Sequence, residues 1–408
     1  MSKPHVRILW YMNPKDGPFP WNGAGRYPRS HENLQKLGQM LDRKNYFGAL
    51  VTGDGYDAWT QSASLIPVTE RMRFLIPIHP GIIPPGLLAQ QARTFDEYSG
   101  GRLMFNQVNG SDVFLPHFGL NYAHDERYDV SAEYWTLFKR LYSGDGSAYS
   151  GKYFKYAAAR PFGLDAPPGP VQLPHTPVWG SGASEPGIRH AGKILDTYLT
   201  FLRRPSELKA QITAAKAEAA AHGRELPIGT LASVIVRETE EEAWAHAESL
   251  LTRTGVKHFV DLLNLRLKTQ KIADGGLESH THPDPQIQAR IDALRAGKLP
   301  SRDALEIYPN LWSGTTTWSP FDVLGTGHGT YIVGNPKQVA ERIRDLQENL
   351  GIDTFILSGW PLIDEAERTA DLLFPYLDLN HPAPKLAGRT SAFSAKSRTE
   401  AREATLAA

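Results

Sequence analysis

The chain has 408 residues, 41% of them hydrophobic, and its lysine plus arginine count equals its aspartate plus glutamate count at 44. The formal net charge of zero argues against a nucleic-acid partner or a membrane-surface partner, because either would need a basic excess. The lack of cysteine excludes disulfides, a thiolate nucleophile and cysteine-based metal sites. We expect one large α/β fold, since a barrel with insertions reaches this length.

The first part of the chain alternates short apolar segments with longer amphipathic ones. The apolar segments predict strands at residues 6–12, 47–52, 73–79 and 102–108. Helices are predicted at residues 31–46, 57–66 and 84–98, and a fourth helix begins with Asp125 and Glu126 in its first turn. Each predicted strand is thus followed by a helix.

The same alternation resumes after residues 142–177, which are rich in glycine, proline and alanine and include an expected hairpin around residues 150–152. A capping box of Thr239 and Glu242 predicts the start of another helix. Strands are predicted at residues 177–179, 196–202, 231–236 and 354–358, and helices at residues 205–222, 337–349 and 364–377.

Eight strands alternating with helices predict a (β/α)8 barrel, a TIM barrel, over residues 1–379. A doubly wound open sheet is the alternative, but it normally has a glycine-rich dinucleotide turn after its first strand. Here that strand runs into Asn-Pro-Lys-Asp-Gly at residues 13–17. Residues 254–333 are expected to form a large insertion between the seventh and eighth strands. Residues 380–408 are expected to form an extended tail that is disordered or packs on a partner subunit.

Functional residues of a barrel gather at the C-terminal ends of its strands. In this sequence those positions are aromatic or hydrogen-bonding, and few are acidic. Asp54, His79 and Asp112 lack the spacing of metal ligands, so we expect no metal. No convincing pair of carboxylates supports a glycosidase. An aromatic rim with few acids suits a flat conjugated cofactor.

Two clusters could bind an anion such as phosphate. His124 and Tyr128 lie four residues apart at a helix start, where backbone amides are free to bind an anion. The glycine–serine turn at residues 180–184 offers further unhindered amides. The simpler interpretations, a capped surface helix and an ordinary tight turn, remain open from these residues alone.

Several segments resemble a known family. FNQVNGSD at residues 105–112 and HDERY at residues 124–128 resemble the reduced-flavin-dependent, bacterial-luciferase-like monooxygenases. Within that family the chain is most similar to the two-component alkanesulfonate monooxygenases, up to about residue 378. The segments that indicate this subgroup are DAWTQSASLIPVTERMRFL (57–75), VIVRETEEEAW (234–244), PNLWSG (309–314) and FILSGWPLIDEAERTADLLFPYL (355–377).

The resemblance implies that the barrel accepts reduced FMN (FMNH2) from a separate NAD(P)H:flavin reductase and uses dioxygen to oxidise an organosulfonate to an aldehyde and sulfite. By position, Asn106 and Asn109 would line the flavin. His124, Tyr128 and Ser184 would hold its phosphate. Ala183 replaces the first of two serines that the family usually has in this turn. This chain therefore lacks one of the two serine hydroxyls that would bind the phosphate.

The departures from the family pattern lie on the substrate side. The family carries a histidine, a cysteine, an arginine, a histidine and a tyrosine where this chain has Pro14, Gly55, Leu231, Ser233 and Trp360. The family's mobile-loop arginine falls in residues 318–329, which contain no arginine. We therefore expect a sulfonate whose organic part differs from a simple alkyl chain.

Arg203 and His328 are the candidates for holding the sulfonate. Arginine offers a fork that matches an oxyanion, while His328 would act when protonated or as a neutral donor. A polar, bulky sulfonate such as a sulfosugar suits the tryptophans, because aromatic faces stack on sugar rings. No catalytic residue is assigned. The other candidates for the substrate side are Trp10, His79, Trp318 and Trp360.

Three other functions stay open. They are a luciferase-like oxygenase that attacks a carbonyl or a C–N bond, a deazaflavin-dependent hydride-transfer enzyme on the same barrel, and a flavin- or sulfonate-binding protein without turnover. Sulfite release with reduced FMN and oxygen would separate the desulfonating enzyme from all three.

Residues 313–329 read as a mobile lid, with glycines at both ends and Trp318 and Phe321 between them. Such a loop can swing on its glycines and close over flavin and substrate. The N-terminal apolar run is too short for a signal peptide, so we expect a cytoplasmic protein. We also expect a homo-oligomer, either a dimer or a tetramer.

Overall fold

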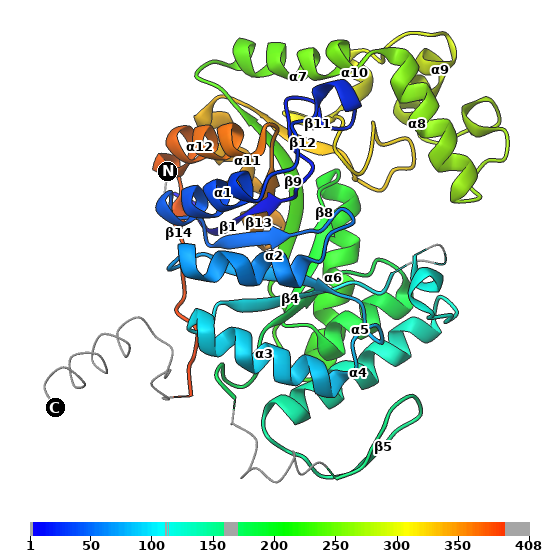
Figure 1. Ribbon diagram of the computed structural model, residues 1–408. Coiled ribbons are helices and arrows are strands. Elements are labelled where there is room, and N and C mark those ends of the chain that lie inside the picture. Colours follow the sequence, from blue (N-terminus) through cyan, green and yellow to red (C-terminus); the bar gives the residue numbers. More distant parts are fainter. Residues whose placement is uncertain (1–2, 111, 113, 159–169, 388–408) are drawn as a thin grey trace, which may run out of the picture.

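The structure is a computed structural model that describes residues 3–110, 112, 114–158 and 170–387. In this part of the chain eight parallel strands close into a barrel, in which each strand pairs with the next and the last pairs with the first (Figure 1). The predicted (β/α)8 barrel is confirmed and the doubly wound sheet is excluded. The barrel strands are β1 (His5–Met12), β2 (Gly48–Val51), β3 (Arg73–Ile78), β4 (Leu103–Gln107), β7 (Val178–Gly180), β8 (Thr197–Phe201), β9 (Ile228–Val236) and β13 (Ile352–Ser358).

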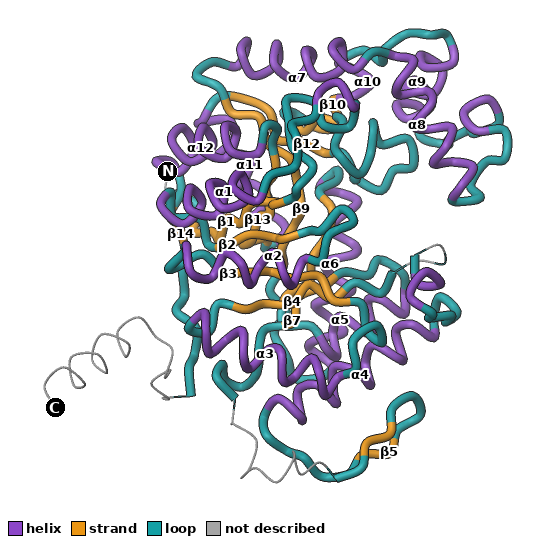
Figure 2. Tube along the Cα trace, viewed as in Figure 1, coloured by secondary structure: helices purple, strands orange, loops and turns teal. Residues whose placement is uncertain are grey.

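Helices cover the outside of the barrel (Figure 2). They are α1 (His31–Arg43), α2 (Ala58–Leu65), α3 (Pro85–Ser99), α4 (Glu126–Tyr142), α5 (Glu185–Ile194), α6 (Pro205–Ala221), α11 (Pro336–Leu350) and α12 (Leu362–Leu373). Short 3-10 turns add η1 (Gly23–Gly25), η2 (Ile66–Val68), η3 (Leu115–Phe118), η4 (Gly276–Glu278) and η5 (Phe374–Tyr376). Prolines begin α3, α6 and α11, where a missing backbone N–H has no cost.

The barrel strands are apolar on both faces because one face packs in the interior and the other packs against helices. On β4, the ring of Phe105 packs outward against Trp135 and Phe138 of α4, with centroids 5.5 and 5.4 Å away. Its neighbour Asn106 therefore faces the barrel interior, since successive side chains of a strand alternate between its two faces.

Strand β9 begins three residues earlier than predicted and continues past the barrel. Its residue Ser233 pairs with Ser358, the last residue of β13, and also with Tyr331 of β12 (Thr330–Gly334). The part of β9 after Ser233 continues the pairing with β12. Because these residues lie beyond the end of β13, β12 and the loop before it are held at the carboxyl end of the barrel.

A long segment between β9 and α11 contains further helices and strands. Its first helix, α7 (Glu240–Thr254), starts with the predicted capping box of Thr239 and Glu242. Helices α7, α9 and α10 lie close together at the top of Figure 1. Strands β11 and β12 are antiparallel and flank the loop of residues 314–329. The remaining elements are α8 (Val256–Thr269), α9 (Pro285–Arg295), α10 (Arg302–Leu305), β10 (Glu306–Tyr308) and β11 (Leu311–Ser313).

Residues 378–387 run along the other end of the barrel. Strand β14 (Asp378–Leu379) pairs with the start of β1. Further on, the Leu173 amide donates to the Lys385 carbonyl at 2.7 Å, and the Ala387 amide donates to the Val171 carbonyl at 2.9 Å. The rest of the predicted tail, residues 388–408, lies outside the described residues.

The expected hairpin consists of β5 (Tyr149–Ser150) and β6 (Lys155–Tyr156), which pair in antiparallel fashion.

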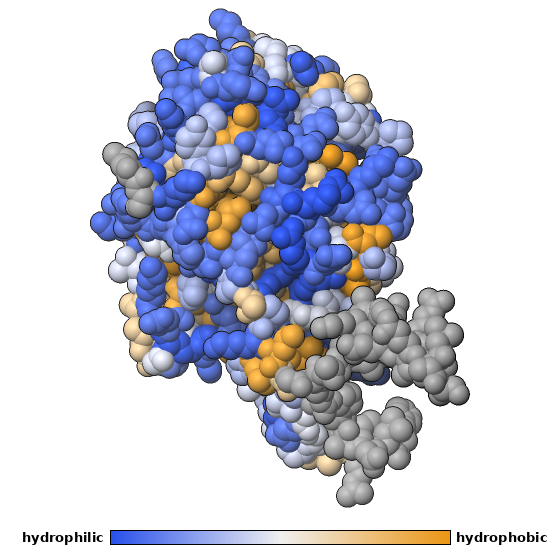
Figure 3. All heavy atoms as spheres, turned by 90° about the vertical axis from the view of Figure 1, so that its left-hand side faces the viewer, coloured by the Kyte–Doolittle hydropathy of each residue, from blue (hydrophilic) through white to orange (hydrophobic). Residues whose placement is uncertain are grey.

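The side of the molecule on which β1 begins is largely hydrophilic, with separate apolar patches between the polar side chains (Figure 3). None of the helices in the described segments is long and apolar enough to cross a membrane.

Candidate functional site

The turn between β7 and α5 meets the start of α4 at the carboxyl end of the barrel. Ser184 caps α5, because its Oγ accepts a hydrogen bond from the Gly187 amide at 3.3 Å. The same hydroxyl donates to Tyr128 Oη at 3.3 Å. The His124 ring lies 5.6 Å from the Tyr128 ring and is half exposed. The structure thus brings together the three residues predicted to bind phosphate.

Glycines make this close approach possible. A Cβ atom on Gly187 would lie 2.9 Å from Tyr128 Oη and 2.8 Å from Gly182 Cα, which is closer than real Cβ contacts allow. The turn therefore presents backbone amides at a helix N-terminus without a covering side chain, an arrangement that suits an anion. Ala183 is exposed and has no hydroxyl, so it can offer only its backbone amide.

The start of α4 differs from the prediction in one respect. Helix α4 begins at Glu126, and Asp125 precedes it as a cap residue without capping through its side chain. Its carboxylate instead contacts His124 Nδ1 at 2.6 Å. Asp125 therefore orients the predicted phosphate ligand and does not shield the amides of the first turn.

The end of β4 carries polar side chains with unused hydrogen-bonding groups. Gln107 Nε2 donates to Asn109 Oδ1. Asn109 Nδ2 and Gln107 Oε1 are buried and have no hydrogen-bond partner among the described residues. Asn106 faces the barrel interior and is half buried, whereas Gln107, the next residue of the strand, starts from the opposite face. A buried amide without a partner costs free energy, so the unused N–H group of Asn109 fits the polar edge of a bound ring system.

His79 follows the end of β3 and lies on the same side of the barrel, because the preceding residue, Ile78, pairs with Gln107 of β4. Its Nδ1 is buried and has no partner among the described residues, and burial lowers its pKa. The ring contacts Phe114 with centroids 4.5 Å apart. The structure therefore places His79 beside the asparagines predicted to line the flavin.

An aromatic wall stands across the mouth of the barrel. The Trp318 ring, from the loop of residues 314–329, lies 4.8 Å from the Tyr11 ring and 5.7 Å from the Trp360 ring. Its indole Nε1 donates to the His328 carbonyl at 2.5 Å. Phe321, the second aromatic of the loop, is buried against Phe259 of α8 instead. Two of the predicted substrate-side tryptophans, Trp318 and Trp360, thus lie together.

The prediction for Trp10 is corrected by the structure. Trp10 is fully buried and contacts Tyr46, whose hydroxyl donates to the Ala366 carbonyl of α12, so it packs between the barrel and its helices. The next residue, Tyr11, faces the mouth. Its hydroxyl accepts a hydrogen bond from Asn13 Nδ2 at 2.9 Å, and burial raises its pKa. Because successive residues of a strand point to opposite faces, the burial of Trp10 against the helices means that Tyr11 faces the barrel mouth. The alternation of side chains along β1 is therefore the signal that could have found Tyr11.

The two predicted sulfonate ligands are already engaged with other residues. Arg203 donates to Gln211 Oε1, and Gln211 in turn donates to Tyr198 Oη at 2.6 Å. His328 lies 4.5 Å from the Phe201 ring, and its Nδ1 accepts a hydrogen bond from Arg266 of α8 at 2.7 Å. Burial, with a smaller contribution from Arg266, lowers the pKa of His328 to about 4, so its ring is neutral at pH 7. The sequence prediction missed Arg266.

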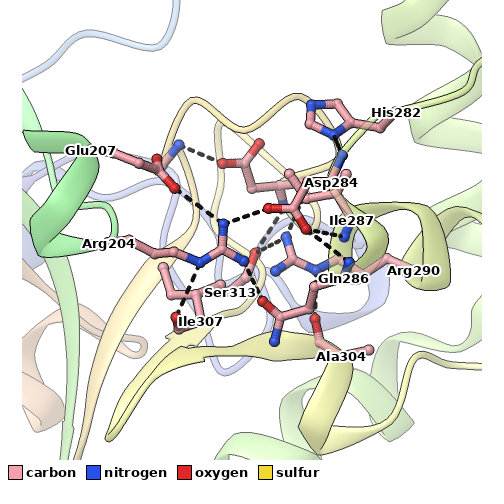
Figure 4. A network of polar contacts seen from close by, with 12 residues as sticks. Arg204, Glu207, His282, Asp284, Gln286, Ile287, Arg290, Ala304, Ile307 and Ser313 are labelled. Atoms are coloured by element: carbon pink, nitrogen blue, oxygen red, sulfur yellow. Dashed lines mark hydrogen bonds and ion pairs between the residues drawn. The ribbon is translucent and has the colours of Figure 1, made fainter.

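A second group of arginines beside this site is structural. Arg204 pairs with Asp284 at 2.6 Å and with Glu207 at 3.1 Å (Figure 4). Arg290 donates to the Ala304 carbonyl at 2.7 Å and to Ser313 Oγ at 3.2 Å. These contacts connect α9 to α6 and to β11. They hold the stem of the loop of residues 314–329 in place.

The carboxyl end of this parallel barrel carries a turn with free backbone amides, unpartnered side-chain amides and an aromatic wall. These features are the ones expected of a barrel enzyme with a conjugated, phosphate-bearing cofactor. The family model for luciferase-like monooxygenases matches residues 18–354. The chain therefore belongs to the luciferase-like monooxygenase family, as the sequence motifs predict.

Solved structures share the fold over nearly the whole chain. DmoA from Hyphomicrobium sulfonivorans is 19% identical, with 97% of this chain and 96% of that chain covered and a TM-score of 0.71. The long-chain alkane monooxygenase LadA is 18% identical, with coverages of 94% and 95% and a TM-score of 0.71. An F420-dependent secondary alcohol dehydrogenase is 15% identical, with coverages of 91% and 99% and a TM-score of 0.60. At these identities the similarity concerns the fold.

Proposed function

We propose that the chain is an oxygenase that uses reduced FMN, delivered by a separate NAD(P)H:flavin reductase, to remove the sulfonate group of an organosulfonate. The main supporting observation is the turn in which Ser184 bonds to Tyr128 above glycines that leave no room for a side chain. This turn fits a phosphate, and family membership makes a flavin phosphate the best candidate.

We assign residues to the phosphate and to the ring of FMN. Tyr128, His124 and Ser184 would hold the phosphate, with the Ala183 amide beside them. Asn106 and Asn109 would face the polar edge of the ring, where Asn109 has an unused N–H group. His79 lies next to them. Bound reduced FMN would supply two electrons and activate dioxygen.

The proposed reaction balances without another reactant. The C–S bond and one C–H bond of the substrate carbon break, and this carbon is oxidised to an aldehyde by receiving one oxygen atom of dioxygen. The sulfur leaves as sulfite together with the proton from the C–H bond. The other oxygen atom becomes water with the two electrons and protons of the reduced flavin.

The residues of the chain contribute exclusion of water and hydrogen bonding. Tyr11, Trp318 and Trp360 cover the mouth with aromatic surface, which favours productive reaction over release of hydrogen peroxide. Burial raises the pKa of Tyr11, so its phenol keeps its proton and can donate a hydrogen bond to a bound substrate. The aromatic faces support a bulky, polar sulfonate such as a sulfosugar.

The test is a screen of organosulfonates with the purified chain, FMN, NADH, a flavin reductase and oxygen, scored by sulfite release. We expect sulfite from at least one bulky, polar sulfonate, and none when oxygen, FMN or the reductase is omitted. Absence of sulfite from every sulfonate, with intact binding of reduced FMN, would contradict desulfonation. Oxidised products without sulfite would indicate attack on a carbonyl or a C–N bond.

Hydride transfer with a deazaflavin is the second candidate, because an F420-dependent secondary alcohol dehydrogenase has the same fold. This enzyme class needs no oxygen. Turnover of an alcohol with F420 under anaerobic conditions would support it. Failure of F420 to bind, when reduced FMN binds, would exclude it. Tight flavin binding with no turnover under any of these conditions would indicate a binding protein.

A further inference from the structure

Arg266 reaches the loop of residues 314–329 from a separate element, helix α8. Its Nη1 donates to Ser319 Oγ at 2.8 Å, and its Nη2 donates to His328 Nδ1 at 2.7 Å. Ser319 directly follows Trp318 of the aromatic wall, and His328 contacts Phe201 at the end of β8. The guanidinium therefore lies at the border between the loop and the mouth of the barrel.

The positive charge of Arg266 is not neutralised by an ion pair within the described part of the chain. The Nε atom of Arg266 is buried without a hydrogen-bond partner among the described residues. Asp322 is the acidic group that acts on it, but its two carboxylate oxygens accept the backbone amides of Leu324 and Gly327. A largely buried cation in this situation is costly, and an anion that binds beside it removes the cost.

His328 holds the guanidinium of Arg266 in place through its ring. Its ring is neutral at pH 7, and its Nδ1 must accept the hydrogen bond because arginine can only donate. The ring proton therefore lies on Nε2, which makes that atom a donor. The two ring nitrogens of an imidazole point in divergent directions, so His328 Nε2 faces away from the guanidinium that Nδ1 holds. Arg266 Nε is therefore the unpartnered donor that an oxyanion can use.

We infer that Arg266, held in place by Ser319 and His328, forms the site for the anionic head group of the substrate, with a sulfonate as the group that the proposed function requires. The inference rests on that proposed function for the sulfonate, although a carboxylate would use the same donors. Arg203 has a different role: its bond to Gln211 leads through Tyr198 to the Gly182 carbonyl of the phosphate turn. The guanidinium missing from the loop sequence is thus supplied by α8.

Methanesulfonate is a suitable probe, because it carries the head group and almost nothing else. Its dissociation constant would be measured by calorimetry on the chain loaded with oxidised FMN, which cannot turn over. We expect Arg266→Met to weaken methanesulfonate binding at least tenfold. The affinity for FMN and for dimethyl sulfone, a neutral molecule of similar shape, should stay within twofold. Unchanged methanesulfonate binding would overturn the inference.

Two matched variants separate charge recognition from simple support of the loop. Lys268→Met removes an exposed positive charge from the same helix, and Ser319→Ala removes the bond between Arg266 and the loop. We expect both to keep methanesulfonate affinity within threefold. If Ser319→Ala reproduces the loss seen in Arg266→Met, the arginine supports the loop and does not bind the head group.

Acetate, a small carboxylate, distinguishes a carboxylate head group from a sulfonate head group. Tighter binding of methanesulfonate than of acetate, dependent on Arg266, supports a sulfonate. The reverse order overturns the sulfonate assignment. Sulfite release reports on the proposed function separately. If the wild-type chain releases sulfite and Arg266→Met retains the wild-type KM, this inference fails and the proposed function stands. If no sulfonate releases sulfite but Arg266 still governs acetate binding, the proposed function fails.

Discussion

The two sides of the barrel mouth are built from different parts of the fold. On the flavin side, Tyr128 and Ser184 lie in segments that follow the barrel strands β4 and β7. On the substrate side, Arg266, Trp318 and His328 come from the long segment between β9 and α11. The flavin side is therefore fixed by the barrel, while the substrate side can change without altering the barrel strands.

The two sides of the barrel mouth also differ in how closely their backbone segments contact each other. Gly182 and Gly187 touch so closely that a side chain on either would collide with the other. On the substrate side, the loop of residues 314–329 is closed at its base by one backbone bond, from the Gly314 amide to the Gly329 carbonyl at 2.8 Å. The turn of Gly182 and Gly187 therefore tolerates little change, and we propose that the inserted segment sets substrate specificity.

The largest expected effect concerns the source of electrons. The flavin side offers a turn for one phosphate, and β1 is followed by no glycine-rich dinucleotide turn. We therefore expect the purified chain, given NADPH, FMN and substrate, to oxidise no NADPH and release no sulfite until a flavin reductase is added. NADPH oxidation measured at 340 nm without reductase would contradict the expectation that a separate protein reduces the flavin.

The next effect concerns the phosphate turn alone. Tyr128→Phe and His124→Ala each remove a hydrogen bond to the phosphate, worth on the order of 1–3 kcal/mol, so reduced FMN should bind roughly 10-fold to 100-fold more weakly. The sulfite yield per reduced flavin consumed should not change. His117→Ala, which removes an exposed histidine before α4, is the matched control. Anaerobic fluorescence titration measures the affinity; wild-type values in both variants would place the phosphate elsewhere.

The residues of the proposed flavin side could be grouped from the sequence because they follow strand ends in short motifs. His124, Tyr128 and Ser184 could be placed by counting from predicted strands and helix starts, and the strand order followed from the alternation. Strand alternation also decides between Trp10 and Tyr11, but the register of a short apolar strand is ambiguous by one residue without its packing partners.

The substrate side could not be predicted in the same way. Arg266 and His328 are separated by 62 residues, and α8 is an amphipathic helix whose exposed and buried charged residues look alike in sequence. The contact exists because β9 extends past the barrel and positions β12, α8 and the loop together. No local pattern encodes that arrangement, which arises from tertiary packing.

A smaller effect is expected on coupling. The proposed lid carries Trp318 against Tyr11 and Trp360, so Trp318→Ala should admit water to the mouth. We expect hydrogen peroxide release to rise and the sulfite yield per reduced flavin to fall about 2-fold to 10-fold, on the scale of one lost aromatic contact. Reduced-FMN affinity should be retained. Trp244→Phe on α7 is the control, and shortening the loop should reproduce the loss; full coupling in both lid variants would show that the loop is not the lid.

The smallest effect concerns a carboxyl group that supports the flavin side from below. Asp96 of α3 is fully buried and accepts hydrogen bonds from Tyr142 of α4 at 2.9 Å and from Thr176, just before β7, at 3.0 Å. It thereby connects the two elements that carry Tyr128 and Ser184. Burial raises the pKa of Asp96 to about 7, although these hydrogen bonds and those from Gln172 and Leu103 oppose the rise.

The sign of the pH dependence follows from this raised pKa. Between about pH 4 and pH 7 the folded chain holds the Asp96 proton that the unfolded chain has lost, so this group's contribution to stability falls as pH rises and is lost above pH 7. From pH 6 to pH 8 the loss is about 1.4 kcal/mol, the equivalent of one pKa unit. Buried histidines act in the opposite sense: burial lowers the pKa of His190 to about 3, so its contribution to stability grows as pH rises from that value toward the unfolded pKa and is complete above it.

Because other groups also titrate between these pH values, the free energy of unfolding must be compared between variants at each pH. We expect Asp96→Asn, which cannot ionise, to lose less free energy of unfolding than the wild type between pH 6 and pH 8, by about 1 kcal/mol. Asp145→Asn is the matched control, because hydrogen bonds from Ser147 and Arg140 lower the pKa of Asp145 and keep it ionised at both values. If urea unfolding shows the same pH slope in wild type and Asp96→Asn, the buried carboxyl is ionised throughout. Its four hydrogen bonds then outweigh its burial, and the support beneath the phosphate turn does not depend on pH.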